Sequence, residues 1–413
     1  MLWAASMSVP LILGGAIQSA AVEIEYWQYF FKERVEAIDA LIEQFQAENP
    51  DITVKHTNFP YDQYRTKVAA AVPAGEGPDV VQLYYGWLKD YLKADLLLPL
   101  PEDQFPAAEI ESEFFPIVKA MKIDGKYWGV PTAVRSLALF YNKKLFAEAG
   151  IDGPPKTHEE MIEDALKITE RDAGGNLLTA GLTAAPTSQD HHWWREVLIR
   201  QHGGQPYSDD NQHVAYNDDA GRAALQNYID IFDTHKVTDY GFMDESQAAF
   251  AAGRAGMHID GSFRLGTFRG VEGLDWGLAP LPTMNGVSSN FASYWVNGIS
   301  KKASGEKLEA AAKFLKFIST PEAMQLWMET VGELPARKAA ALTDANRADP
   351  EYGPFIEGLD GAHTTDFVNE SAQRQVFLDM IDRIKIGGES VDAALAKAAE
   401  EEQKILDEFY ATN

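Results

Sequence analysis

The 413-residue chain contains no cysteine. This absence excludes disulfide bonds, a thiolate nucleophile, a zinc–thiolate site, an iron–sulfur cluster and a cysteine-linked lipid anchor. Basic residues are also scarce: 36 Lys and Arg stand against 62 Asp and Glu, for a formal net charge of −26. Such a charge repels the phosphates of nucleic acids and anionic lipid head groups. Neither nucleic acid nor a membrane surface is therefore an expected partner.

Common catalytic motifs are missing as well. The chain has no Gly-x-Ser-x-Gly, no phosphate-binding Gly-x-x-x-x-Gly-Lys-Ser/Thr and no Gly-x-Gly-x-x-Gly. His158 is followed by two glutamates but not by the second histidine of a zinc helix, and the acidic segments 209–211 and 218–219 lack the glycine of a calcium loop. We therefore expect solvated acidic loops, no metal, no cofactor and no enzymatic activity.

The segment His191-His-Trp-Trp194 is an unusual local cluster. Adjacent histidines can chelate a metal, but adjacent residues of a helix point in different directions, and no carboxylate at helical spacing completes a ligand set. Two interpretations stay open, a face of aromatic rings and imidazole that lines a pocket, and a packed loop.

The length and the amino terminus indicate an exported protein of two domains. A chain of this length, 46% hydrophobic and 24% charged, exceeds one ordinary core. The apolar segment 7–22 ends in small residues, which predicts a signal peptide cleaved near Ala21. A membrane anchor is the alternative, but the segment is short for a bilayer span and contains Pro10, Gly14 and Gly15.

Hydrophobic periodicity predicts a strand over 22–29, a helix from Val35 through Phe45 that ends before Pro50, a strand over 52–56, a helix over 61–72 and a strand over 79–83. This alternation implies a parallel sheet with helices on its faces, and ligands bind beyond the carboxyl ends of such strands. Aromatic and amide side chains follow those ends, at residues 27–29 and 84–87. They can belong to the core, but several in a row cannot all point inward.

A second unit begins after Gly129-Val-Pro-Thr132. Thr157 and Glu160 form a capping box before a helix over 161–169, a second helix covers 220–232, and a strand is expected over 256–260. An acidic, alanine-rich helix is expected over 391–409, with its charges on a solvated face. No repeat and no low-complexity linker is present, so the domains must be joined by short hinges.

Several phrases together resemble the extracellular solute-binding proteins of ABC sugar importers, the family that includes maltose-binding protein. They are Gly77-Pro-Asp-Val-Val81, Asp124-Gly-Lys-Tyr-Trp-Gly-Val-Pro-Thr132, Leu139-Phe-Tyr-Asn-Lys143, Gly253-Arg-Ala-Gly-Met257, Ala279-Pro-Leu-Pro282, Ala312-Lys-Phe-Leu-Lys316, Thr320-Pro-Glu322 and Gly332-Glu-Leu-Pro-Ala-Arg337. Their order and spacing extend across nearly the whole chain.

The resemblance implies an α/β, two-lobed periplasmic-binding-protein fold of class II type, each lobe a mainly parallel sheet flanked by helices, with the ligand cleft between them. Residues 22–133 plus 295–320 would form the amino-terminal lobe, and 134–294 plus 321–413 the carboxyl-terminal lobe, after a signal peptide of 1–21. Closure of the lobes would bury a sugar or sugar derivative, which a monomer in the periplasm would deliver to ABC permease subunits.

Residues that match the family's ligand contacts are Gln28, Tyr29, Tyr84, Tyr85, Trp87, Thr132, Arg135, His192, Trp193, Ser262, Phe263, Tyr294, Trp295, Asn297, Arg337 and Arg374. Sugar C–H faces pack on aromatic rings, and hydroxyls bind planar polar groups. Maltose-binding protein has several acidic side chains at these positions, so their replacement here argues against a maltodextrin. Arg135 and Arg374 also suit a carboxylate, sulfonate or phosphate on the ligand.

Two other functions are compatible with an exported protein of this kind. A secreted carbohydrate-active enzyme needs two carboxylates about 5 to 10 Å apart in the cleft, whereas the strand ends here carry aromatics. The same fold can also bind a polyamine, a metal complex or another small solute. A polyamine would favour several cleft carboxylates, and the candidate positions hold few.

Overall fold

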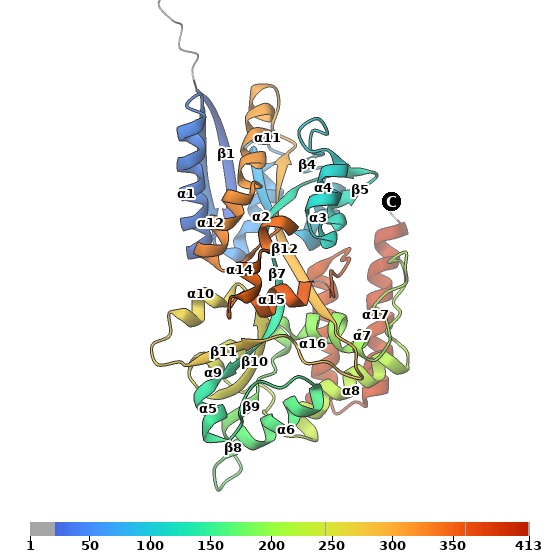
Figure 1. Ribbon diagram of the computed structural model, residues 1–413. Helices are drawn as coiled ribbons and strands as arrows, with labels where there is room; N and C mark the ends of the chain where they lie inside the picture. Colours follow the sequence, from blue (N-terminus) through green and yellow to red (C-terminus); the bar gives the residue numbers. More distant parts are fainter. Residues whose placement is uncertain (1–20, 244, 360, 412–413) are drawn as a thin grey trace, which may run out of the picture.

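The computed structural model describes residues 21–243, 245–359 and 361–411, so the expected signal peptide lies, except for Ala21, outside the described residues. Figure 1 shows two groups of helices and strands joined by the long strands β7 (Val130–Asn142) and β12 (Asn290–Ser300). We call the upper group, around β1 (Val22–Tyr29), the first lobe, and the lower group, around β9 (Leu177–Leu182) and β10 (Ala255–Gly261), the second lobe. No helix in these ranges is both long and apolar enough to cross a bilayer.

The first lobe begins with a parallel sheet. β1 lies between β2 (Ile52–Phe59) and β3 (Val80–Tyr84), with Tyr26 opposite both His56 and Val80. Parallel neighbours need crossover connections, and α1 (Lys32–Glu48) and α2 (Tyr61–Ala71) supply them, as the sequence predicts. The lobe continues through α3 (Leu88–Lys93), β4 (Leu97–Leu98), α4 (Ala107–Glu113), β5 (Lys122–Ile123) and β6 (Lys126–Tyr127).

Two antiparallel strands carry the sheet from one lobe to the other. Toward the first lobe, β12 pairs with β3, and Trp295 lies opposite Tyr84. Toward the second lobe, β7 pairs with β10 and β11 (Trp276–Ala279), and Phe140 lies opposite His258. The strand order β2-β1-β3-β12-β7-β10-β9-β8 is therefore continuous, with β8 (Glu170–Arg171) at its end.

The second lobe surrounds its end of the sheet with α5 (Lys143–Glu148), α6 (His158–Ile168), α8 (Asp219–Asp233), α9 (Ser246–Ala251), α16 (Glu370–Lys385) and α17 (Val391–Ala411). The Thr157 hydroxyl caps α6 by accepting the Glu160 amide at 3.2 Å, as predicted. The charges of α17 are not all solvated. Glu402 is fully buried and accepts hydrogen bonds from Arg195 at 3.0 Å and Tyr216 at 2.7 Å.

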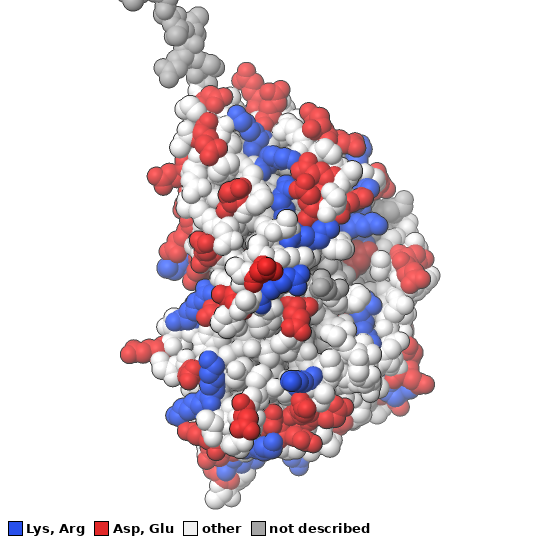
Figure 2. Space-filling model, viewed as in Figure 1, with Lys and Arg blue, Asp and Glu red and all other residues white. Residues whose placement is uncertain are grey.

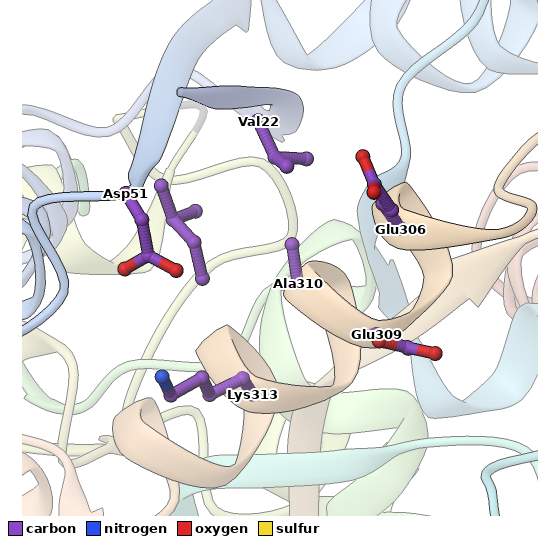
Figure 3. A pocket seen from close by; sticks show the side chains of 7 residues that line it. Val22, Asp51, Glu306, Glu309, Ala310 and Lys313 are labelled. Atoms are coloured by element: carbon purple, nitrogen blue, oxygen red, sulfur yellow. The ribbon is translucent and has the colours of Figure 1, made fainter. Parts of the chain in front are cut away.

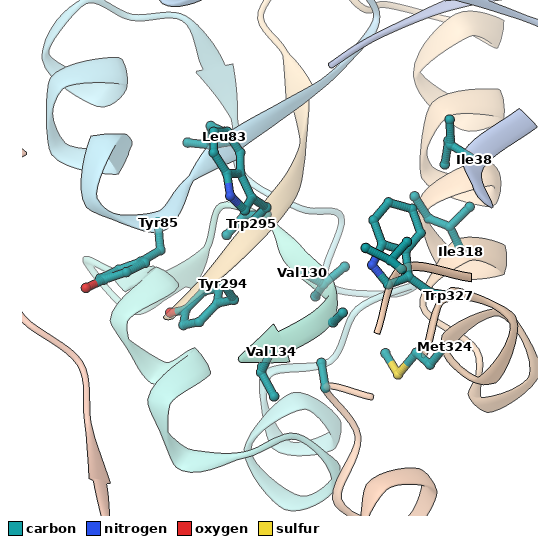
Figure 4. Packing of buried hydrophobic residues seen from close by; sticks show 14 of the residues in the cluster. Ile38, Leu83, Tyr85, Val130, Val134, Tyr294, Trp295, Ile318, Met324 and Trp327 are labelled. Atoms are coloured by element: carbon teal, nitrogen blue, oxygen red, sulfur yellow. The ribbon is translucent and has the colours of Figure 1, made fainter. Parts of the chain in front are cut away.

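The molecule has two main hydrophobic cores, of which the first is centred in the first lobe and continues to Phe140, Leu177 and Phe250 of the second lobe. Figure 4 shows part of the first core, where Leu83, Val130 and Tyr294 pack from three strands and Trp327 packs from α12 (Pro321–Val331). The second core gathers side chains of α8, α16 and α17 against β9 and β10, among them Tyr228, Phe377 and Ala398.

The third segment of the first lobe is longer than the sequence indicates. The expected boundary near Thr320 assigns residues 321–413 to the second lobe, but α12 packs against α1, and its side chain Met324 lies in the first core beside α11 (Glu306–Ile318). β13 (Leu334–Pro335) then pairs with Val134 and Ala133 of β7. The elements α13 (Lys338–Ala341), α14 (Asp344–Ala348), α15 (Gly353–Leu359) and β14 (Ala362–His363) lead from there to α16.

The last helix contacts both lobes. α17 packs along α16 and α8 in the second lobe, and Figure 1 shows its end directed toward α3 of the first lobe. There the ammonium of Lys89 lies 5.8 Å from the ring centroid of Phe409 and 5.8 Å from that of Tyr410. Lys89 also forms a 2.9 Å ion pair with Asp366.

Candidate functional site

A cavity of about 340 Å³ lies between the lobes, where β7 and β12 connect them. Side chains of both lobes and of the connecting strands line it: Tyr29, Phe31, Tyr61, Tyr84, Arg135, Ser188, Gln189, His191, His192, Phe263, Arg264, Ser293, Trp295, Glu370 and Arg374. The volume falls within the roughly 300–1,000 Å³ that is typical of small-molecule sites.

The first lobe supplies an aromatic wall, which we define as Tyr29, Tyr61, Tyr84 and Trp295. Tyr29 and Tyr84 stand at the carboxyl ends of β1 and β3, as the parallel sheet requires. The ring centroid of Trp295 lies 4.3 Å from that of Tyr29 and 5.7 Å from that of Tyr84. Tyr61 completes the wall at the start of α2 and is 53% exposed. These rings offer flat apolar faces to a ligand.

A bulge places Trp295 in this wall. The pairing of β12 with β7 shifts between Tyr294, opposite Val134, and Val296, opposite Pro131. Two residues of β7 therefore face the single residue Trp295, and such a bulge turns a side chain away from the regular alternation of the strand. Figure 4 shows Trp295 and Tyr294 on neighbouring positions of β12, with Tyr294 beside Tyr85.

Beneath the wall lies a buried charge cluster of Arg34, Arg135 and Glu333. The antiparallel pairing of β13 with β7 brings Glu333 next to Arg135, and the Glu333 carboxylate lies 3.6 Å from Arg135 Nε. The same carboxylate binds the Arg34 guanidinium and accepts the Trp327 indole N–H at 2.9 Å. Burial alone would raise the pKa of Glu333, but the two guanidiniums outweigh it and hold that pKa below its usual value.

The second lobe presents Phe263, Arg264 and Arg374 to the cavity. The buried Asp260 fixes Arg264 by accepting its Nε–H at 2.8 Å, and His258 contacts the same carboxylate oxygen at 3.1 Å. The Arg135 guanidinium carbon lies 5.0 Å from the Phe263 ring centroid, across the junction. Arg374, on α16, donates to the Thr187 carbonyl.

His191 and His192 are neutral groups of the cavity wall. The His192 ring stacks on Phe291 with centroids 3.7 Å apart and an interplanar angle of 10°. Burial lowers the pKa of both histidines well below the usual value, and the nearby cations Arg374 and Arg195 lower it further. Within the ranges the structure describes, no group of three or more His, Cys, Asp or Glu is placed to hold a metal ion.

Seven of the sixteen residues proposed from the sequence line the cavity: Tyr29, Tyr84, Arg135, His192, Phe263, Trp295 and Arg374. The other nine are not among its lining residues. Gln28, Tyr85, Trp87, Trp193 and Ser262 are buried in the lobes, and Thr132, Tyr294, Asn297 and Arg337 have partners inside the fold.

The partners of those four explain their positions. The Tyr294 hydroxyl donates to the Ile117 carbonyl at 2.9 Å. The Asn297 amide donates to Thr132 at 3.2 Å, and its oxygen accepts the Tyr26 hydroxyl at 2.9 Å. Arg337 donates to the Ser319 carbonyl at 2.7 Å and forms ion pairs with carboxylates of α4.

Eight further lining residues are not among the ligand contacts predicted from the sequence: Phe31, Tyr61, Ser188, Gln189, His191, Arg264, Ser293 and Glu370. Local signals existed for some of them. His191 and Arg264 adjoin residues that were proposed, and Glu370 lies one helical turn before Arg374. Ser293 lies opposite Arg135 in the sheet, and the sequence contains no signal for that pairing.

Another cavity, of about 330 Å³, lies at the far end of β1. Figure 3 shows Asp51, Glu306, Glu309 and Lys313 around it, with Val22 at the start of β1. Its lining contains no aromatic ring and comes from the first lobe alone, so it does not share the convergent geometry of the cavity between the lobes.

Two α/β lobes, joined by two strands and lining one cavity together, define a two-lobed solute-binding protein. The chain belongs to the family of bacterial extracellular solute-binding proteins, whose model matches residues 40–354. This confirms the resemblance and the solute-binding function inferred from the sequence.

Individual relatives agree. The chain is 27% identical over 361 residues to the sn-glycerol-3-phosphate-binding periplasmic protein UgpB of Escherichia coli, covering 82% of this chain and 79% of UgpB. It is 24% identical over 351 residues to the maltotriose-binding protein of Pyrococcus abyssi, covering 83% and 72%.

Solved structures confirm the fold. The GacH receptor of Streptomyces glaucescens superposes with a TM-score of 0.80 at 23% identity, covering 94% of this chain and 99% of that one. The cyclic alpha-maltosyl-1,6-maltose binding protein of Arthrobacter globiformis gives 0.80 at 24% identity, covering 94% and 100%.

Proposed function

We propose that the chain captures a sugar or sugar-like polyol in the cavity between its lobes and delivers it to the permease of an ABC importer. The carrying observation is the composition of the cavity, in which an aromatic wall on the first lobe faces polar and charged side chains on the second. Rings suit the apolar faces of a sugar, and guanidinium, amide and hydroxyl groups suit its oxygen atoms. The ligands for which two relatives are named, maltotriose and sn-glycerol 3-phosphate, belong to this chemical range.

Capture follows from the connection of the lobes. The ligand binds residues from both sides of the junction, so rotation of one lobe toward the other about β7 and β12 brings its second set of contacts into place. The protein acts as a monomer in the periplasm. Its signal peptide directs it there and is then cleaved.

The cavity argues against the two alternatives. Glu370 is the one carboxylate-bearing residue among its lining residues, whereas glycoside hydrolysis uses a pair. A polyamine needs carboxylates around its ammonium groups, and this lining has more guanidiniums than carboxylates.

A thermal-shift screen against sugars, polyols, sugar acids and polyamines tests the proposal. A ligand at 100 times its dissociation constant adds about 2.7 kcal/mol of stability. We expect a shift with a sugar or polyol and no chemical turnover of that ligand. Stabilisation by a polyamine alone, or cleavage of the bound sugar, would contradict the proposal.

Matched aromatic variants locate the binding site. Tyr61 is 53% exposed and lines the cavity, whereas Phe30 is 55% exposed and lies outside its lining. Tyr61→Ala should reduce the ligand-induced shift, and Phe30→Ala should leave it unchanged. Equal behaviour of the two variants would exclude the aromatic wall as the binding surface.

A further inference from the structure

The cavity between the lobes carries an excess of positive charge. Arg34, Arg135, Arg264 and Arg374 lie in or directly beneath it, against the three carboxylates of Glu333, Asp260 and Glu370. Its two histidines are neutral. The chain as a whole has a formal charge of −26, and Figure 2 shows acidic side chains over both lobes. Because the protein as a whole is acidic, the positive charge of the cavity does not follow from the overall composition. It comes from these arginines.

Arg135 is only partly neutralised. Glu333 lies between Arg34 and Arg135 but makes its hydrogen bond to Arg34, and its 3.6 Å separation from Arg135 Nε exceeds a hydrogen bond. The side chain of Arg135 is 12% exposed, and its buried Nε finds no hydrogen-bond partner in the described part of the chain. A buried guanidinium with an unused donor calls for an acceptor.

Arg374 has a similar deficit on the opposite lobe. One of its terminal nitrogens donates to the Thr187 carbonyl, which is a neutral acceptor. Its Nε is buried and has no hydrogen-bond partner among the described residues. The two arginines also share neighbours, since both act electrostatically on Tyr61 and on His192.

We infer that the ligand carries an anionic group, a phosphate, sulfonate or carboxylate, which binds between Arg135 and Arg374 while its sugar or polyol body packs on the aromatic wall. The inference deepens the proposed function and rests on it. A guanidinium offers a planar pair of donors that matches the oxygens of such groups. Arg135 belongs to β7 and Arg374 to α16, so one anion bound by both links the connecting strand to the second lobe. Binding of the charged group would therefore also favour closure of the cavity.

Calorimetric titration with matched ligand pairs tests this inference. The probes are glycerol with sn-glycerol 3-phosphate, glucose with glucose 6-phosphate and glucuronate, and inorganic phosphate and sulfate alone. We expect an anionic sugar or polyol to bind at least about 10-fold more tightly than its neutral counterpart. Phosphate and sulfate alone should bind more weakly than the substituted ligand, because they do not reach the aromatic wall.

Charge variants then assign the preference to the two arginines. Arg135→Gln and Arg374→Gln should each weaken binding of the anionic ligand by about 10-fold or more, about 1.4 kcal/mol, beyond any loss of affinity for the neutral one. Arg347→Gln removes the same charge at an exposed position outside the cavity and should change neither affinity. The melting temperature of each unliganded variant shows that it is folded.

The remaining outcomes distinguish failure of this inference from failure of the proposed function. Equal or tighter binding of the neutral ligands, or an equal loss of both affinities in the arginine variants, would overturn the inference while leaving the proposed function intact. Failure of every neutral and anionic sugar or polyol to bind would overturn the proposed function, and the inference with it.

Discussion

Replacement of Glu333 by glutamine should destabilise the first lobe, although the two side chains have nearly the same size and shape. The Glu333 side chain is 4% exposed and its partner Arg34 is 1% exposed, so the substitution leaves a guanidinium charge buried without its counter-ion. Removal of one partner of a buried ion pair costs about 3–5 kcal/mol. The Trp327 indole, which donates to the same carboxylate, can still donate to the glutamine oxygen.

Thermal unfolding followed by circular dichroism measures this loss. An unfolding entropy of about 2.1 cal/mol/K per residue converts the loss to a melting temperature lower by about 3 to 6 °C for a chain of this length. Glu43→Gln, at an exposed position of α1, is the matched control and should change the melting temperature by less than about 1 °C.

A double variant separates charge from packing. Arg34→Met combined with Glu333→Gln leaves no bare charge at the position of Arg34, so it should lose less stability than Glu333→Gln alone. A change below about 1 °C in Glu333→Gln, or a larger loss in the double variant, would refute the assignment of a stabilising role to this carboxylate.

Two further results are expected. Asp190 accepts the Tyr228 hydroxyl at 2.7 Å, and burial raises the pKa of its carboxyl group to about 7. Between about pH 4 and 7 the folded state therefore holds a proton on Asp190 that the unfolded state has lost. The free energy of unfolding should therefore fall as the pH rises through that window, by up to about 1.4 kcal/mol per pH unit. Urea unfolding from pH 4 to 8 should show this pH dependence for the unmodified protein and not for Asp190→Asn. Equal pH dependence in the two proteins would contradict the assignment to Asp190. Gly181→Ala should lower the free energy of unfolding in urea by about 3 kcal/mol or more, because the new Cβ would lie 2.0 Å from the Ala165 carbonyl oxygen. The control Gly153→Ala, whose Cβ would have no atom within 4 Å, should change it by less than about 0.5 kcal/mol. A tolerated Gly181→Ala would show that β9 can move away from α6.

Local elements of this fold could be predicted from the sequence because each has a strong period. Alternation over β1 and the three- and four-residue spacing of α1 matched the observed Val22–Tyr29 and Lys32–Glu48. The same pattern does not name the partner of an element. The apolar stripe of α12 predicts a buried face, but only the folded chain shows that this face packs on α1.

The site was harder to predict because its geometry depends on irregular backbone. A 3₁₀ turn over Tyr85–Trp87 follows β3, so Tyr84 faces the cavity while Tyr85 stacks on Tyr294 at 5.0 Å. The bulge at Trp295 likewise has no sequence signature. The pairing of Arg34 with Glu333 joins residues 299 positions apart, a distance over which periodicity carries no information.

Because α17 contacts both lobes, the proposed rotation of one lobe toward the other would change the contacts at the end of this helix. α17 packs on α8 and α16 in the second lobe, and Phe409 and Tyr410 at its end lie against Lys89 of the first lobe. A reporter dye attached beside Tyr410 would sense the separation of α17 from α3. A bulky fusion at the same place would act as a wedge, so affinity tags and fluorescent partners are better attached elsewhere.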